Sequence, residues 1–307
     1  MVRIRTSVRV FALLSFTLAL SAAAQAQTRT WVDGVGDDLN PCSRTAPCRT
    51  FSKAHSVTSA NGEINAVSPG SYGTVTVTKS ITIDGGDVIA AITSTGANGV
   101  SINDSGTNTI VVTLRNLTIN GMASGGTNGI NFISGKTLNV DHCKIAGNTA
   151  ASPNGGGIRV SATASGGTVN VIDSMLFNNR VGVTATTTTG NVTVNVLRSV
   201  ITHNTSDGVL LNFGAHGTVE DSKLAFNGGA GVSLNNSAFN NATVLDSEVH
   251  HNNIGLFVGT GTTLKLGGSG VNQNSTNFSN NGTIVSFCDN RTETVTIPGA
   301  VTTTCLH

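Results

Sequence analysis

Residues 218–228 read TVEDSKLAFNG, and residues 243–253 read TVLDSEVHHNN. Both stretches hold an Asp-Ser pair, an aliphatic residue two positions after the Ser, and an Asn five positions after it. Four further segments align on the same position: VDHCKIAGN (140–148), IDSMLFNN (172–179), LRSVITHN (197–204) and GGSGVNQN (267–274). The aligned positions are 22 to 31 residues apart, so the chain is built from repeats of that length.

Four columns of the alignment keep their character from repeat to repeat. The aligned position is small: Cys143, Ser174, Ser199, Ser222, Ser247 and Ser269. The position two residues later is aliphatic: Ile145, Leu176, Ile201, Leu224, Val249 and Val271. The position five residues later is asparagine: Asn148, Asn179, Asn204, Asn227, Asn252 and Asn274. A Gly with an aliphatic residue behind it follows: Gly157-Ile158, Gly182-Val183, Gly208-Val209, Gly231-Val232 and Gly255-Leu256.

This pattern predicts an all-β solenoid. Apolar and polar residues alternate within each repeat, which places one set of side chains inside and the other outside a strand. Repeats of this length hold two or three short strands, and stacking pairs each strand in parallel with its equivalent in the next repeat. We therefore expect a parallel β-helix with a continuous apolar core, a buried column of small residues and a ladder of Asn amides.

Other repeat architectures fit less well. A leucine-rich repeat would need the spacing L-x-x-L-x-L-x-x-N, which the chain lacks. A β-propeller blade needs about 40 residues, which is longer than these repeats. A β-sandwich would not keep such strict columns.

The N-terminal end of the solenoid needs a cap, because its first core layer would otherwise be exposed. Residues 49–60 place Phe51, Ala54 and Val57 on one face. This spacing predicts a short amphipathic capping helix that stops at Asn61-Gly62.

The first 26 residues have the features of a secretory signal peptide. Three Arg precede an apolar run from Val10 to Leu20, and Ala24-Gln25-Ala26 forms an A-x-A cleavage site. We expect export to the periplasm, the cell surface or the medium, with no membrane span left after cleavage. The alternative is an N-terminal membrane anchor, for which the apolar run is short. The expected parts are a signal peptide (1–26), an N-terminal cap with a helix (27–62), a β-helix (63–282) and an irregular C-terminal cap (283–307).

The charge balance argues against nucleic acid as a partner. Cleavage of residues 1–26 removes three Arg and no acid, which changes the net charge from +1 to −2. Such a balance favours neither nucleic acid nor an anionic membrane surface. We expect the mature protein to be a monomer.

The chain has five Cys, all after residue 26. In an exported protein, Cys42 and Cys48 would form one disulfide and Cys288 and Cys305 a second, although other pairings are possible. Cys143 stands in the small-residue column, so we expect a buried and unreactive thiol. The chain has no C-x-x-C motif that would indicate a zinc site.

The stretch from Thr50 to Gly85 adds a second indication of the fold. It contains TF at 50–51, VSPGSYG at 67–73 and KSITI at 79–83. This run resembles the opening of secreted right-handed parallel β-helix proteins of the pectin-lyase-like superfamily, and with the repeats the resemblance covers about residues 30–285. The resemblance implies a right-handed β-helix with a capping helix. It implies no single activity, because this fold hosts lyases, hydrolases, esterases, adhesins and inert scaffolds.

The catalytic motifs of that superfamily are missing. Pectin methylesterases carry a D-F-I-F-G segment, which the chain lacks. Polygalacturonases carry N-T-D, D-D, G-H-G and R-I-K; the chain offers Ala215-His216-Gly217 as a partial match, and its Asp37-Asp38 lies ahead of the helix. The motifs around the catalytic Arg of pectate lyases are not recognisable. No catalytic residue of the superfamily can therefore be assigned to a position here.

The residue before the small column should point outward, and most of these residues are charged. They are His142, Asp173, Arg198, Asp221, Asp246 and Gly268. We expect Asp173, Arg198 and Asp221 to form a solvated row of charges, worth about 0–1 kcal/mol for each pair. Asp221 beside Asp246 is less favourable, since like charges on neighbouring strands repel. This pair would stay solvated, take Lys223 as a partner, or bind calcium.

Two functions are compatible with these features. The first is a scaffold that contacts extracellular polysaccharide without turnover and needs no cofactor. The second is a calcium-dependent polysaccharide lyase or glycoside hydrolase with a divergent site at Asp173, Arg198, Asp221 and Asp246, in which calcium and Arg198 would act on a uronate. We expect His250 and His251 to face opposite ways, as neighbours on a strand do, and so not to share a metal ion.

Overall fold

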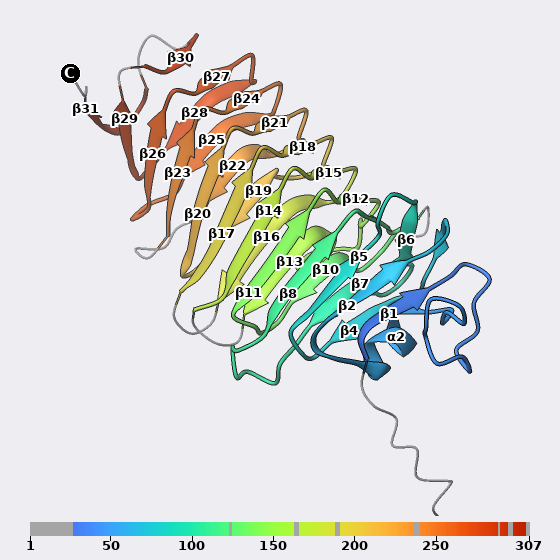
Figure 1. Cartoon of the computed structure of the whole chain (residues 1–307). Coiled ribbons are helices and arrows are strands. Elements are labelled where there is room, and N and C mark those ends of the chain that lie inside the picture. Colours follow the sequence, from blue (N-terminus) through green and yellow to red (C-terminus); the bar gives the residue numbers. More distant parts are fainter. Residues whose placement is uncertain are drawn as a thin grey trace, which may run out of the picture.

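The computed structural model describes residues 27–122, 125–162, 166–187, 191–235, 240–287, 289–293 and 297–304. These residues form three long sheets of parallel strands and one short helix, wound into an elongated coil (Figure 1). Each complete turn of the coil contributes one strand to each sheet, so strands that are neighbours in a sheet come from successive turns. The predicted right-handed parallel β-helix is confirmed. The expected signal peptide, residues 1–26, lies outside the described residues.

The three sheets differ in strand length. The first sheet contains β1 (Gln27–Val32), β2 (Thr58–Ala66), β5 (Ile81–Asp84), β8 (Val111–Arg115), β11 (Thr137–Asp141), β14 (Thr168–Ile172), β17 (Val192–Leu197), β20 (Ala215–Glu220), β23 (Asn241–Leu245), β26 (Thr263–Gly267), β29 (Thr283–Phe287) and β31 (Ala300–Thr304). The second contains β3 (Gly70–Ser71), β6 (Ala90–Thr93), β9 (Leu117–Asn120), β12 (Lys144–Ala146), β15 (Met175–Phe177), β18 (Val200–Thr202), β21 (Lys223–Ala225), β24 (Glu248–His250), β27 (Gly270–Asn272) and β30 (Arg291–Thr292). The third contains β4 (Val75–Val77), β7 (Asn98–Ile102), β10 (Asn128–Phe132), β13 (Gly156–Ala162), β16 (Val181–Thr187), β19 (Val209–Leu211), β22 (Ala230–Leu234), β25 (Ile254–Val258) and β28 (Thr276–Asn280).

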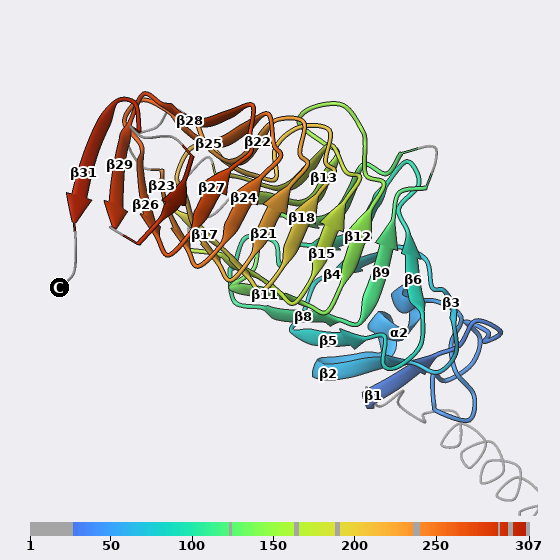
Figure 2. The same cartoon turned by 90° about the horizontal axis from the view of Figure 1, so that it is seen from above.

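The core follows from the alternation in the strands. In β17, Val192, Val194 and Val196 are buried, whereas the residues between them are partly exposed. The register places like residues beside each other, as in the pairing of Val196 with Val219 in β20. Apolar columns therefore run through the interior from one repeat to the next, with the three sheets around them (Figure 2).

The small-residue column is buried and forms its own hydrogen-bonded ladder. Ser222 Oγ accepts the backbone N–H of Ser199 at 3.0 Å and donates to the carbonyl of Glu220 at 2.7 Å. Cys143 occupies the same column and is 1% exposed. Burial raises the pKa of the Cys143 thiol to about 12. The prediction of a buried thiol is confirmed, and such a thiol is a poor nucleophile at neutral pH.

The predicted asparagine ladder is also present. Asn227 Nδ2 donates to Asn252 Oδ1 at 2.9 Å, and Asn204 Nδ2 donates to Asn227 Oδ1 at the same distance. Each of these carbonyl oxygens also accepts the backbone N–H of the residue that donates to it. Because the amides are buried, the ladder satisfies polar groups that would otherwise be costly.

Two corners of each coil are turned by a residue with positive φ. The first-sheet to second-sheet corner uses His142 (φ 50°), Asp173 (47°), Arg198 (45°), Asp221 (48°) and Asp246 (47°). The second-sheet to third-sheet corner uses Asn178 (54°), His203 (54°), Phe226 (57°), His251 (56°) and Gln273 (52°). This left-handed conformation costs roughly 1 kcal/mol for a residue with a Cβ. It bends the chain sharply within one residue and turns the side chain outward.

Helix α2 (Phe51–Val57) closes the N-terminal end, as predicted. Thr50 caps it by accepting the backbone N–H of Lys53 at 3.1 Å, and Phe51 and Ala54 are buried. The helix is shorter than the expected 49–60, because the backbone is already extended at Thr58, where β2 begins.

The sheets extend further toward both ends than the sequence indicated. Strand β1 pairs with β2 ahead of the helix, within the segment expected to be only a cap. At the other end, β29 and β31 continue the first sheet beyond residue 282, where we expected irregular structure. Thr30 and Val32 are buried in β1, so this strand uses the same alternation as the repeats.

The Cys42–Cys48 disulfide is formed and ties down the loop between β1 and α2. Cys288 and Cys305 lie outside the described residues.

Candidate functional site

The charged residues singled out by the sequence lie together along the first corner. We call His142, Asp173, Arg198, Asp221 and Asp246 the corner row. Their side chains point outward, as predicted, since each residue has a positive φ and follows a first-sheet strand. His142, Arg198, Asp221 and Asp246 are exposed. The row therefore stands on a convex edge of the coil.

One ion pair in the corner row is well formed. Arg198 Nε donates to Asp173 Oδ1 at 2.9 Å, and Arg198 Nη2 donates to Asp173 Oδ2 at 2.8 Å. This paired geometry lowers the pKa of the Asp173 carboxyl, and the Asp173 carboxylate raises the pKa of Arg198. Asp221, on the next coil, adds a smaller through-space contribution that raises the Arg198 pKa.

Asp221 and Asp246 do not converge with a third ligand. Within the described ranges, neither carboxylate forms an ion pair, and Lys223 does not bridge them. In the same ranges, three side chains that could together hold a metal ion are Asp141, His142 and Asp173. Their possible ligand atoms lie within 4.8 Å of one another. The calcium site at Asp221 and Asp246 stays a prediction.

The Asp141, His142 and Asp173 group is already engaged internally. His142 Nδ1 lies 2.6 Å from Asp141 Oδ1. Both oxygens of Asp173 accept hydrogen bonds from Arg198, whose positive charge compensates the negative charge of the carboxylate. Asp141 was missed at the sequence level, because the corner row was read one residue per repeat and Asp141 is the last residue of β11.

A polar strip runs along the outer face of the first sheet. It consists of the middle outward residue of seven successive strands: Thr113, Asn139, Asn170, Asn195, Thr218, Thr243 and Lys265. Asn195 Nδ2 donates to Asn170 Oδ1 at 2.9 Å, and Asn170 Nδ2 donates to Asn139 Oδ1 at 2.9 Å. The sequence signal is the Asn that precedes Val in NVD, NVI and NVL at 139–141, 170–172 and 195–197, but these Asn are uncharged and belong to no catalytic motif.

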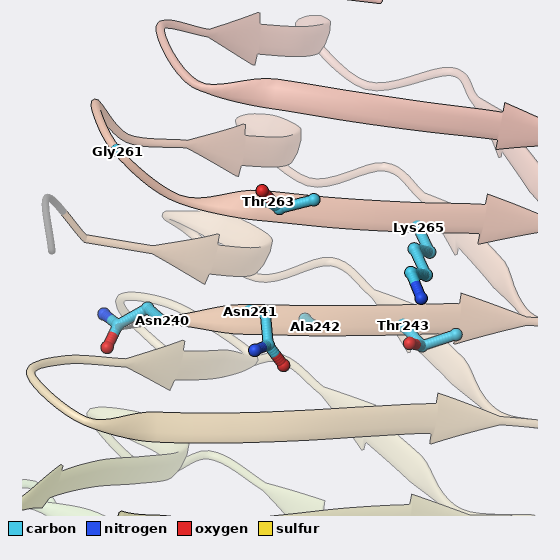
Figure 3. A pocket seen from close by; sticks show the side chains of 7 residues that line it. All are labelled: Asn240, Asn241, Ala242, Thr243, Gly261, Thr263 and Lys265. Carbon is cyan, nitrogen blue, oxygen red and sulfur yellow. The ribbon is translucent and has the colours of Figure 1, made fainter. Parts of the chain in front are cut away.

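The polar strip ends in a hollow of about 260 Å³. Figure 3 shows its lining of amides, hydroxyls and one amine: Asn240, Asn241, Ala242, Thr243, Gly261, Thr263 and Lys265. The register pairs Asn241 with Thr263 and Thr243 with Lys265, and the Lys265 side chain runs toward the strand that carries Thr243 (Figure 3). Asn240 is buried and holds the edge of the hollow, because its Nδ2 donates to the carbonyls of Leu211 and Asn235.

The lining of this hollow consists mainly of side chains that form hydrogen bonds. Among the described residues, none that lines the hollow is a carboxylate, a thiol or a histidine, the side chains that most often act as general acid or base near pH 7. It does supply hydroxyl and amide groups and one cation, Lys265, which forms no ion pair within the described residues.

The two adjacent histidines differ from the prediction. His250 Nδ1 and His251 Nδ1 lie 2.7 Å apart, and the His251 ring stacks on Phe226, which in turn stacks on His203. The expectation of opposite directions was wrong because His251 is a corner residue with φ 56°, outside the regular strand. Within the described residues, no third Asp, Glu, Cys or His ligand joins this pair closely enough to complete a metal site.

Neither a protein-family model nor a curated protein sequence matches the chain. Several solved structures are similar in fold, among them the following two. Pectate lyase Pel9A superposes with a TM-score of 0.50 at 15% identity, over 85% of this chain and 69% of that one. The GH136 lacto-N-biosidase from Eubacterium ramulus has a TM-score of 0.50 at 10% identity, over 97% of this chain and 70% of that one. The chain has the pectin-lyase-like β-helix fold.

At such identities the likeness concerns the path of the backbone alone. The likeness therefore establishes the parallel β-helix fold and assigns no role to any residue of this chain. Among the described residues, no helix has the length and apolar character to span a membrane.

Proposed function

We propose that this pectin-lyase-like β-helix is an exported, monomeric scaffold that binds polysaccharide along the outer face of its first sheet. The observation that carries the proposal is the polar strip with its terminal hollow, which offers hydroxyl and amide groups along seven successive strands. Strands in a sheet lie roughly 4.8 Å apart, so a sugar chain laid along the coil meets a new row of polar groups every strand. The Cys42–Cys48 disulfide supports an oxidising compartment.

Binding without turnover fits the placement of charges. Four of the five residues of the corner row are exposed to solvent, and among the described residues none that lines the hollow is a carboxylate or a histidine that could act as an acid or base near pH 7. Enzymes of acid–base type need such groups within reach of the bond that breaks. Lys265 would add preference for an acidic sugar, since its amine can pair with a carboxylate.

Affinity electrophoresis of the purified mature protein, in gels that contain neutral or acidic polysaccharides, tests this proposal. We expect retardation by at least one polysaccharide, abolished in the double variant Asn195→Ala/Thr243→Ala. Lys265→Ala should weaken binding of an acidic polysaccharide about fivefold, the effect of losing roughly 1 kcal/mol. The matched control is Lys144→Ala, an exposed lysine on the second sheet. Equal losses in Lys265→Ala and Lys144→Ala would reject a site on the first sheet.

The alternative is a calcium-dependent lyase or hydrolase at the corner row. The observation in its favour is the group of Asp141, His142 and Asp173. Calcium-dependent release of unsaturated uronates or reducing ends, lost in Asp173→Asn and Asp221→Asn, would establish this activity and overturn the binding scaffold. Retained turnover in both variants would exclude the corner row as the site.

A further inference from the structure

The longest repeat carries an inserted loop that the first-sheet site does not use. The Asn of the ladder is separated from the Gly of the next strand by nine positions between Asn148 and Gly157, but by three between Asn179 and Gly182. The loop 149–155 is therefore longer than its counterparts in the coils that follow. Insertions in repeat proteins commonly decorate a binding face.

Arg180 holds this inserted loop against the third sheet. Its Nε donates to the carbonyl of Asn154 at 2.7 Å, and its backbone N–H donates to the carbonyls of Asn148 and Gly155. Gly155 has φ 83° and lies so close to Arg180 that a Cβ would come within 2.8 Å of the Arg180 Cβ. The loop is thus fixed in one position beside β13 and β16.

A hollow of about 170 Å³ lies between the loop and the sheet. Ser152 and Pro153 of the loop form one wall, and Arg159, Thr184, Thr186 and Asn212 are among the residues of the sheet side. The register places Arg159 beside Thr184, so the guanidinium shares the outer face of the third sheet with hydroxyl groups. Among the described residues, none that lines this hollow is acidic.

Arg159 is half-buried and lacks a counter-charge. In the described part of the chain, it takes part in no ion pair, and burial alone lowers its pKa. Arg180, in contrast, has Asp207 nearby: the Arg180 charge counteracts the rise that burial causes in the Asp207 pKa. A guanidinium that has lost part of its hydration without gaining a carboxylate is favourably placed to bind an anion.

We propose that the hollow beneath the loop 149–155 is a second binding site, which takes an oxyanion group such as a carboxylate or a sulfate on Arg159. The planar guanidinium offers two parallel N–H donors to such a group, and the hydroxyls of Thr184 and Thr186 line the same hollow. The site is independent of the polar strip, because it lies on another sheet of the coil. Anionic ligands would reach it even if the first sheet bound no polysaccharide.

Isothermal titration of the full mature chain tests the site, with glucuronate, inorganic sulfate and inorganic phosphate as separate probes. Ionic strength is held constant with sodium chloride. We expect saturable binding of at least one probe, weakened about tenfold or more in Arg159→Gln because a charge-assisted hydrogen-bond pair is lost. The preferred probe tells whether a carboxylate, a sulfate or a phosphate is the natural group.

Two further variants keep the test decisive. Arg44→Gln removes an exposed charge outside both sites and should leave binding unchanged. Arg159→Lys keeps the charge and the folded state but loses the planar fork, so binding should be intermediate. Equal weakening in Arg44→Gln and Arg159→Gln, or no saturable binding by the wild-type protein, would overturn the proposal. Its failure would leave the first-sheet test unaffected, since that test uses different variants and polysaccharide ligands.

Discussion

At the residue scale, the columns of the repeat have distinct physical roles. The small column is polar yet buried, and each Ser Oγ both accepts a backbone N–H from another coil and donates to a carbonyl in its own coil. In the Asn column, the side-chain oxygen of Asn227 accepts both the backbone N–H and the side-chain N–H of Asn204 on the preceding coil. Because every member is bonded to the next, the cost of burying polar groups is offset along the whole row.

Removing one amide from the ladder should destabilise the protein markedly. In Asn252→Ala, the carbonyls of Leu224 and His250 each lose one donor, and the backbone N–H and the side-chain amide of Asn227 lose their acceptor. We expect the free energy of unfolding to fall by about 3 kcal/mol, since buried groups are left unpaired. Urea denaturation followed by circular dichroism measures the change. The neighbouring Asn253→Ala removes an exposed amide and should change stability by less than about 0.5 kcal/mol. Similar losses in both variants would contradict a role for the ladder.

At the element scale, strands were predicted better than corners. The alternation of apolar and polar residues determines which side chains of β17 and β23 are buried. Once one face of a strand is apolar, only one orientation of the strand turns that face toward the core. The corners were not predicted. A positive φ is usually recognised in a sequence by Gly or Asn, whereas Asp221 and His251 adopt it without either residue type. This gap explains why the contact between His250 and His251 was missed.

The candidate sites also differ in how far the sequence predicts them. The outward direction of the corner row and its ion pair between Asp173 and Arg198 could be predicted from spacing alone. The hollow at Lys265 and the one at Arg159 could not, because each depends on where a variable loop lies over a sheet. Repeat columns specify the sheets, whereas loop positions depend on contacts specific to one coil.

The capping helix α2 provides a pH-dependent element. Burial, with a further contribution from Lys79, lowers the pKa of His55 to about 4, below its usual value of 6.5. The folded state therefore favours neutral His55, and the stability that this contributes is complete above about pH 6.5 and is lost as the pH falls toward 4. We expect a loss of roughly 2 kcal/mol over that interval. Urea denaturation at pH 7 and pH 4.5 should show a smaller difference in His55→Gln than in the wild type. An unchanged difference would show that His55 is not responsible.

At the scale of the whole molecule, the fold is a one-dimensional stack. Among the described residues, each strand pairs with strands of the coils on either side of it, and a few side chains, such as Arg291 with Glu248 and Arg115 with Glu63, reach past one coil to the next. The two ends of the stack differ in structure. At the N-terminal end, α2 and the loop with the Cys42–Cys48 disulfide cover the core, whereas at the C-terminal end β29 and β31 extend the first sheet. Such an arrangement tolerates changes in the number of coils more readily than changes in register.

Deleting one whole coil tests this view of the molecule. Deletion of residues 222–246 would join Asp221 to Ser247 and preserve every column, because the two Ser occupy equivalent positions. We expect a folded protein with the circular dichroism spectrum of the wild type and cooperative thermal unfolding. Deletion of residues 222–247 is one residue longer and would place Glu248 in the buried column, with Val249 turned toward solvent. A one-residue slip exchanges the inner and outer faces, so this second variant should fail to fold cooperatively. If both deletions behaved alike, the columns would not be what specifies the coil.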